Sequence, residues 1–206
     1  AGKGIDLTKA QIFQALAAEV EVNGEIVANP YKNWNEIDAS LPNQPITVIN
    51  RGVNGEEAAD MVARLDEGVL SERPDLILWQ VGANAVLRDN PIPAVRSDIL
   101  EGLRRMKASD ADVILIDPQF APKVIVTPDA EHMVELIATT AKAAGVDLFR
   151  RFAVMRHWRQ VARIPFETFI SPDELHMNDW SYGCVAKLLA GAIAEQRLRD
   201  AEPAVL

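Results

Sequence analysis

Cysteine is almost absent from this sequence, which has one, Cys184, in 206 residues. A disulfide within the chain is therefore impossible, so the fold cannot depend on an oxidising compartment. Cys184 lies in an apolar helical pattern, which predicts a core thiol rather than a reactive one. There are only three histidines, and they share no ligand spacing, so we expect no metal site and no cofactor.

Long apolar runs are also missing. No stretch of about 18 apolar residues occurs, so we expect no membrane-spanning helix, and we find no pattern of a signal peptide. The sequence predicts a soluble protein, of the cytoplasm or of the periplasm. The 21 Lys and Arg are outnumbered by 30 Asp and Glu, which gives a formal net charge of −9. This acidic balance argues against nucleic acid as a partner, because phosphates would be repelled.

Four short apolar runs alternate with amphipathic stretches from residue 46 onward. The runs are Ile46–Asn50, Leu76–Val81, Val113–Asp117 and Val146–Phe149. Continuous apolar runs fit strands that are buried on both faces, and their alternation with helices predicts a parallel sheet. We therefore expect a three-layer α/β/α fold. Apolar residues at helical spacing predict helices around residues 58–69, 99–106, 133–144 and 185–193.

The first 45 residues are organised differently. An apolar face predicts a helix over Leu7–Ala18, which Thr8 can cap. Asn23-Gly24 then predicts a β-hairpin. A stretch rich in proline and asparagine follows over Asn29–Pro45. We expect this helix and the irregular segment to replace the first strand of the sheet.

Two polar patches directly follow predicted strands, at the edge of a parallel sheet where ligands bind. Gly55 lies in the first patch, Asn50–Glu56, where a glycine lets a backbone N–H approach a substrate or merely permits a tight turn. Asn84 lies in the second patch, Gly82–Asn84. Its side-chain amide can donate to a developing oxyanion, or it can cap the next turn.

A third patch, SPDELHMND over residues 171–179, leads into the last predicted helix. Asp173 stands three residues before His176, so its carboxylate can accept the imidazole Nδ1–H. The other ring nitrogen is then left free as a base. The Asp-x-x-His spacing is also common by chance, and a histidine on a surface is often inert.

Together the three patches resemble the second, third and fifth blocks of the SGNH (GDSL-type) hydrolases. Their order and strand context agree with that family over roughly residues 46–196. The resemblance implies an SGNH-type, flavodoxin-like fold and hydrolysis of carboxylic esters without a metal. It implies Asp173 and His176 as the acid and base of a triad, with Gly55 and Asn84 as oxyanion donors. The expected partner is a small ester or acylated molecule.

The family's first block has no counterpart here. That block is a Gly-Asp-Ser-like turn after the first strand, and it carries the nucleophilic serine. Ser40 lies too close to the second block and follows no predicted strand, and Thr8 is explained by helix capping. Ser171 and Ser181 lie close to His176 along the chain, which makes each a poor choice. We therefore assign no nucleophile.

Residues 2–16 and 29–38 resemble a fragment of the periplasmic phosphate-binding proteins of ABC transporters. We therefore divide the chain into a phosphate-binding-protein-like segment, residues 1–45, and an SGNH-hydrolase-like domain, residues 46–206. This division describes a fusion, in which the segment replaces the first strand and the nucleophile turn.

Three functional hypotheses follow. The first is an esterase that recruits a hydroxyl from elsewhere, for example across a dimer interface, or in which His176 activates water. The second is a catalytically inactive scaffold or interaction protein, because a missing first strand would expose sheet edges and favour a homo-oligomer. The third is residual phosphate binding by residues 1–45.

Overall fold

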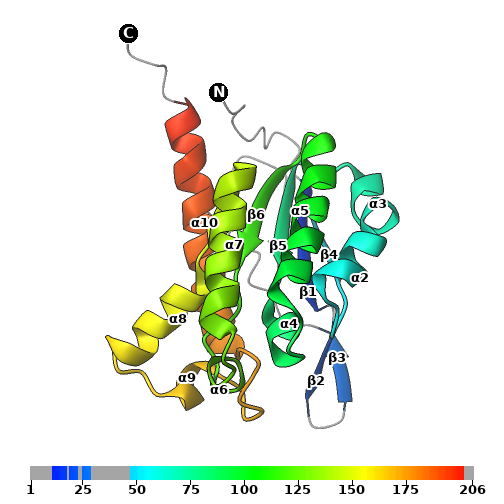
Figure 1. Ribbon diagram of the computed structural model, residues 1–206. Helices are drawn as coiled ribbons and strands as arrows, with labels where there is room; N and C mark the ends of the chain where they lie inside the picture. Colours follow the sequence, from blue (N-terminus) through cyan, green and yellow to red (C-terminus); the bar gives the residue numbers. More distant parts are fainter. Residues whose placement is uncertain (1–10, 18, 23–24, 29–46, 202–206) are drawn as a thin grey trace.

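A parallel sheet of five strands forms the centre of the molecule (Figure 1). The computed structural model describes residues 11–17, 19–22, 25–28 and 47–201, with side chains over residues 47–193. The strands run in the order β4-β1-β5-β6-β7, which is the flavodoxin-like arrangement with the first strand between the second and third. Their bounds are β1 Gln11–Ala17, β4 Thr47–Gly52, β5 Leu76–Gln80, β6 Asp112–Ile116 and β7 Asp147–Phe149.

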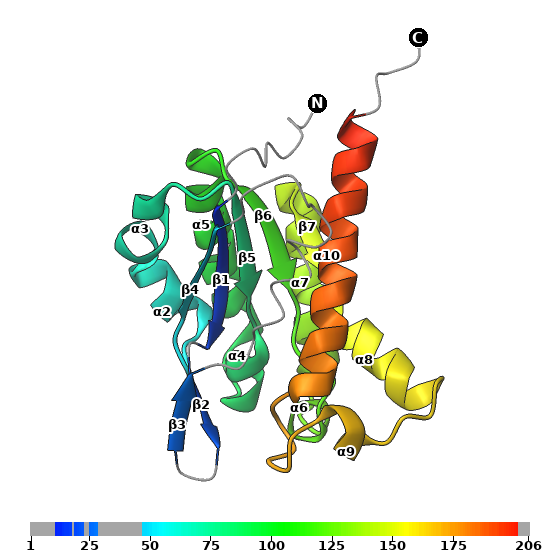
Figure 2. The ribbon, with the colours of Figure 1, turned by 180° about the vertical axis from the view of Figure 1, so that it is seen from behind.

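Helices cover both faces of this sheet, as the sequence predicts. α5 and α7 lie on one face and α10 lies on the other (Figures 1 and 2). The predicted helix around residues 58–69 is broken into two short helices, and the other three form as expected. The helices are α2 Ala58–Ala63, α3 Leu65–Gly68, α4 Ala83–Leu87, α5 Ile92–Ala108, α6 Pro122–Ile125, α7 Ala130–Ala144, α8 Arg151–Gln160, α9 Phe166–Phe169 and α10 Asp179–Ala201.

The two faces of β5 are both buried, which explains why its sequence is continuously apolar rather than alternating. Ile77 and Trp79 belong to the larger core on the side of α5 and α7. Leu76 and Leu78 belong to a second core, to which Leu189 of α10 contributes. Since successive side chains of a strand point to opposite faces, a strand buried in this way needs an apolar residue at nearly every position.

Residues 11–17 form a strand, so the helix predicted over Leu7–Ala18 is wrong. β1 pairs with β4 on one side and with β5 on the other, so that Ile12 lies opposite both Val48 and Leu76. A short apolar run fits either a strand or a helix, and here pairing along both edges decides. A short helix at this position would be only marginally stable by itself, whereas the strand is hydrogen-bonded along both edges.

This strand also bears on the expectation that the chain forms a homo-oligomer through open sheet edges. The edges of β4 and β5 that a missing first strand would expose are both paired with β1. Those edges are therefore not free to pair with a second copy of the chain, as the expected homo-oligomer required. Thr8 lies outside the described residues.

The hairpin predicted from Asn23-Gly24 is confirmed. β2, Glu19–Val22, pairs antiparallel with β3, Glu25–Ala28, and the hairpin projects beyond the carboxyl end of β1 (Figures 1 and 2). The stretch Asn29–Pro45 lies outside the described residues. The division after residue 45 stays a prediction, although β1 belongs to the sheet of the second unit.

Gly102 in α5 lies directly against Trp79, a fully buried side chain. A Cβ at this glycine would lie 2.3 Å from Trp79 Cη2 and 3.0 Å from Val62 Cγ2. Alanine is favoured over glycine in a helix by about 1 kcal/mol, but overpacking a rigid core typically costs about 1–3 kcal/mol, and an approach this close to a buried ring belongs at the upper end of that range. We therefore expect Gly102→Ala to lower the free energy of unfolding by about 2 kcal/mol, measured in urea.

Gly191 in α10 provides the control for this substitution. A Cβ at Gly191 would meet nothing within 4 Å, so Gly191→Ala should leave the stability unchanged or raise it slightly. Equal stability of Gly102→Ala and the wild type would contradict the packing of Trp79 described above.

Candidate active site

Asp173 and His176 form a hydrogen-bonded pair in the loop between α9 and α10. His176 Nδ1 is bonded to Asp173 Oδ2. The other carboxylate oxygen, Oδ1, accepts the backbone N–H groups of Leu175, at 3.0 Å, and of His176, at 2.9 Å. Partial burial by itself raises the pKa of Asp173. The bonds from the His176 side chain and from these two N–H groups lower it by more, so the pKa lies below its ordinary value. The carboxylate is therefore charged and fixed in place.

This geometry leaves the Nε2 atom of His176 available. The side chain of His176 is 57% exposed, and within the described part of the chain Nε2 has no hydrogen-bond partner. When Nδ1 carries the proton that Asp173 accepts, Nε2 is the basic nitrogen. The pair can therefore take a proton from a molecule that binds beside it.

The loop that carries the pair is fastened to the segment that follows β6. Lys123 N–H donates to Glu174 O at 3.1 Å, and the Gln119 side-chain amide donates to Leu175 O at 3.2 Å. Glu174 adopts a positive φ of 61°, which is uncommon for a residue with a side chain. Such a turn lets the Asp173 carboxylate fold back onto the two N–H groups that follow it.

The buried side chain of Arg151 supports this contact between the loop and the segment after β6. The Arg151 guanidinium donates from Nη2 to Gln119 Oε1 at 3.1 Å, from Nη1 to Gln80 Oε1 at 2.7 Å and from Nε to Asp117 O at 3.0 Å. Arg151 is 2% exposed. It therefore links the ends of β5 and β6 to α8 and orients Gln119, which holds the loop of His176.

Asp117 lies in the same buried layer, at the end of β6. Its Oδ1 accepts the backbone N–H of Phe152 at 2.7 Å, near the start of α8. Burial raises the pKa of Asp117 to about 6, against the lowering effects of the Phe152 N–H and of the charge on Arg151. The folded protein therefore holds a proton on Asp117 in a pH range where the unfolded chain has lost it.

This difference predicts how stability changes with pH. Between about pH 4 and pH 6 the unfolded chain binds fewer protons than the folded one, so the Asp117 contribution should fall by about 3 kcal/mol as the pH rises. Above about pH 6 it should stay constant. Asp117→Asn keeps an oxygen acceptor for the Phe152 N–H and removes the titration. Urea unfolding at several pH values should show the wild type losing stability relative to Asp117→Asn across this range, and a constant difference would contradict the prediction.

Asn84 and the Gly55 loop meet at the carboxyl ends of β4 and β5. Asn84 lies in the first turn of α4, and its Nδ2 donates to Glu56 O at 2.8 Å. Gly82, which precedes the helix, has a φ of +95°, and Gly55 has a φ of +77°, so both adopt a left-handed conformation that glycine tolerates best. The amide of Asn84 has a second N–H, which the bond to Glu56 leaves available.

These two groups of residues lie at the same edge of the sheet. Gly55 and Asn84 follow parallel strands, and the loop of Asp173 and His176 is bonded to the segment after β6. Moreover, α4 packs against α6, which holds Glu174 through Lys123. Figures 1 and 2 show α4, α6 and the loop before α10 at this end of the molecule. The roles assigned to these residues stay predictions.

The serines near His176 are held by other groups. Ser181 is fully buried, and its Oγ donates to Phe169 O at 2.6 Å. Ser171 Oγ donates to Met177 O at 3.2 Å. Ser40 lies outside the described residues. After β1, where the resemblance places the nucleophile, the sequence continues Ala18-Glu19-Val20, without a hydroxyl or a thiol.

The remaining histidine and cysteine candidates have plain structural explanations. His132 is exposed, and its Nδ1 lies 3.0 Å from Asp129 Oδ1. This second Asp-x-x-His pair was missed in the sequence, although its spacing is the same. Cys184, predicted in the core, is only half-buried, and burial raises the pKa of its thiol.

No group of three His, Cys, Asp or Glu residues that could hold a metal occurs in the described ranges. None of the described helices is long and apolar enough to cross a membrane.

An oriented Asp–His pair at the carboxyl edge of a doubly wound sheet is typical of hydrolytic α/β enzymes. The non-GDSL lipase-like family matches the chain over residues 17–199, and the chain belongs to this family. An arylesterase from Vibrio mimicus is 32% identical over 94 residues, 44% of this chain and 47% of that protein. An acetylxylan esterase from Geobacillus stearothermophilus is 32% identical over 60 residues, 29% of this chain and 27% of that protein. The chain thus aligns with less than half the length of these curated relatives.

Solved structures confirm the fold. The lipase/acylhydrolase from Enterococcus faecalis superposes with a TM-score of 0.73 at 19% identity, over 91% of this chain and 96% of that one. The acetylxylan esterase from Geobacillus stearothermophilus superposes with a TM-score of 0.72 at 15% identity, over 95% of this chain and 96% of that one. These superpositions confirm the predicted parallel α/β fold, and the family match supports the predicted SGNH-type lineage.

Proposed function

We propose that this protein hydrolyses carboxylic esters, with His176 as the base and Asp173 as the acid that orients it. The observation that carries this proposal is the Asp173–His176 pair, in which the carboxylate is held by two backbone N–H groups and accepts the imidazole Nδ1–H. In such a pair the carboxylate sets the tautomer of the imidazole and stabilises the charge that it acquires during reaction.

The attacking group in this proposal is water. The residues directly after β1, Ala18-Glu19-Val20, carry no hydroxyl or thiol, and the Oγ atoms of Ser171 and Ser181 donate to backbone carbonyls. His176 Nε2 takes a proton from water while the water oxygen bonds to the ester carbonyl carbon. The C–O bond to the alcohol then breaks, and Nε2–H returns the proton to the alkoxide, which leaves as the alcohol.

In this proposal, the neighbouring loops stabilise the intermediate that forms when water adds to the ester carbonyl. The carbonyl oxygen becomes negatively charged when water adds, and donors preset around it lower the barrier. The second N–H of Asn84 and the backbone N–H of Gly55 are the donors in this proposal. The bond from Asn84 to Glu56 O keeps the two donors together, because it joins the helix that carries Asn84 to the loop that carries Gly55.

The first substrates to test are acetyl and aryl esters. The arylesterase and the acetylxylan esterase described above supply this choice, and the structural neighbours include two catalytic mutants of the acetylxylan esterase, in which a serine or a histidine is replaced by alanine. Single displacement by water would be slower than a complete triad, because loss of a triad member costs several orders of magnitude.

The test is hydrolysis of p-nitrophenyl acetate, combined with a search for a covalent intermediate. The wild type should release p-nitrophenol faster than the buffer blank. Intact mass spectrometry during turnover should show no acetylated chain, and a fluorophosphonate should neither label nor inactivate the protein. Labelling of a hydroxyl would overturn the water route while leaving the esterase assignment in place.

A non-catalytic member of the family is the second candidate, and the absence of a hydroxyl at the positions directly after β1 favours it. A wild-type rate that equals the buffer blank with a panel of acetyl and aryl esters would overturn the esterase proposal in favour of this candidate. Phosphate binding by residues 1–45 has no support from the described residues.

A further inference from the structure

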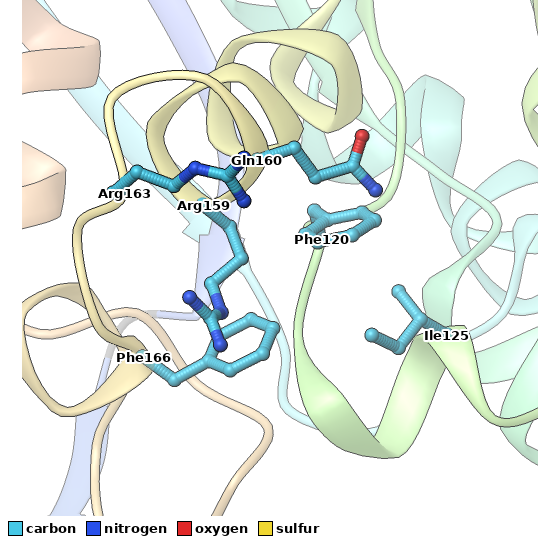
Figure 3. A pocket seen from close by; sticks show the side chains of 6 residues that line it. All are labelled: Phe120, Ile125, Arg159, Gln160, Arg163 and Phe166. Carbon is cyan, nitrogen blue, oxygen red and sulfur yellow. The ribbon is translucent and has the colours of Figure 1, made fainter.

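A cavity of about 330 Å³ lies between α8, α9 and the segment that follows β6. Its walls are Phe120, Ile125, Arg159, Gln160, Arg163 and Phe166. Figure 3 shows these side chains around one hollow, with Phe120 and Ile125 on one side and Phe166 on the other. None of these six residues belongs to the site proposed for ester hydrolysis.

One part of this cavity is aromatic. The rings of Phe120 and Phe166 are stacked, with centroids 6.0 Å apart and planes inclined by 21°. Phe120 is also held edge-on against Phe152, at 5.1 Å, so its ring is fixed from behind. Rigid ring faces of this kind favour a flat apolar group, because aromatic pairs gain from offset stacking as well as from burial.

The other part of the cavity is cationic. Neither the side chain of Arg159 nor that of Arg163 has a hydrogen bond or an ion pair with another residue in the described part of the chain. The guanidinium of Arg159 lies over the ring of Phe166, at 5.3 Å from its centroid (Figure 3).

The turn after α8 fixes where Arg163 lies. Arg163 has a φ of 60°, a left-handed conformation that is uncommon for a residue with a side chain. The turn is closed by backbone bonds from Ala162 N–H to His157 O, at 3.0 Å, and from Ile164 N–H to Trp158 O, at 2.9 Å. Arg163 is therefore held at the cavity by the backbone.

From this combination we infer that the cavity is a binding site for a small aromatic carboxylate. The ring of such a ligand would lie against Phe120 and Phe166, and its carboxylate would accept hydrogen bonds from Arg159 and Arg163. Guanidinium groups bind carboxylates through paired N–H donors, and these bonds are stronger than those between neutral groups. The volume is at the small end of the range for ligand pockets, which suits one ring rather than a larger molecule.

Calorimetry with benzoate tests this inference, with benzamide as a neutral ligand of the same shape. Benzoate should bind with a dissociation constant on the order of 1 mM, and benzamide should bind about tenfold more weakly. Arg159→Gln and Arg163→Gln should each weaken benzoate binding about fivefold or more. Both side chains are exposed, so the variants should keep the wild-type melting temperature.

Two control variants locate the binding. Arg156→Gln alters an arginine of the same helix that already pairs with Glu131 and lies over Phe152, so it should leave the affinity unchanged. His176→Ala should also leave it unchanged, which separates this cavity from the proposed ester site. Equal affinity for benzoate and benzamide, no saturable binding of benzoate, or an equal loss in Arg156→Gln would overturn the inference.

Discussion

Replacing His176 by alanine is expected to lower kcat/KM for p-nitrophenyl acetate by about 10²–10⁴-fold. The substitution removes the Nε2 base and leaves the rest of the loop in place. Asp173 keeps its bonds from the N–H groups of residues 175 and 176, and the loop keeps its bonds to Gln119 and Lys123. The loss should therefore come from chemistry and not from unfolding, which a thermal melt would check.

His132→Ala is the matched control for this experiment. His132 forms the chain's other Asp-x-x-His pair, with Asp129, and its side chain is even more exposed than that of His176. If proximity to a carboxylate were enough for hydrolysis, the two variants would lose activity alike. We expect full activity in His132→Ala. Equal rates in wild type and His176→Ala would remove the catalytic role of His176.

Replacing Asn84 by alanine is expected to lower kcat by about 10²–10³-fold, with a smaller effect on KM. A donor to the oxyanion acts mainly in the transition state, because the carbonyl oxygen gains its charge only when the nucleophile adds. The same substitution breaks the bond to Glu56 O, which should lower the free energy of unfolding by about 1 kcal/mol. Assays at a temperature well below the melting point separate the two effects.

Asn90→Ala is the control for this second prediction. Asn90 also donates its side-chain amide to the loop after β4, to Glu57, but it lies beyond the end of α4. Its loss should cost stability and little activity. An Asn84→Ala variant with unchanged kcat and a raised KM would assign Asn84 to substrate binding instead.

Much of the sheet could be predicted because burial on both faces leaves a strong pattern. The four runs from residue 46 onward became β4, β5, β6 and β7. β5 and β6 are apolar because helices pack on both of their faces, whereas β4 and β7, at the edges of the sheet, are only partly buried. The first strand could not be predicted in this way, because an apolar pattern alone does not distinguish a strand from a helix. Residues 11–17 are an apolar run that also matches a helix, and only the partners β4 and β5, which come later in the chain, decide between the two.

The Asp173–His176 pair could be predicted because its two residues are close in the chain, and a local hydrogen bond needs no knowledge of the fold. The Arg151 network could not, because Gln80 and Arg151 are 71 positions apart and meet only after the sheet has formed. In the sequence, two adjacent arginines, Arg150 and Arg151, predict an exposed polar site, whereas Arg151 is buried in the structure. The cavity beside Phe120 could not be predicted for the same reason, since its six residues come from two separate segments, residues 120–125 and 159–166.

In the proposed mechanism, His176, Asn84 and Gly55 surround one carbonyl group. The most direct measurement is an NMR titration with acetate, the product of an acetyl ester, which follows the His176 ring, the Asn84 side-chain amide and the Gly55 backbone amide. We expect all three signals to shift with a single dissociation constant, while the signal of the His132 ring stays unchanged. Shifts at only one of the three, or at different dissociation constants, would contradict it.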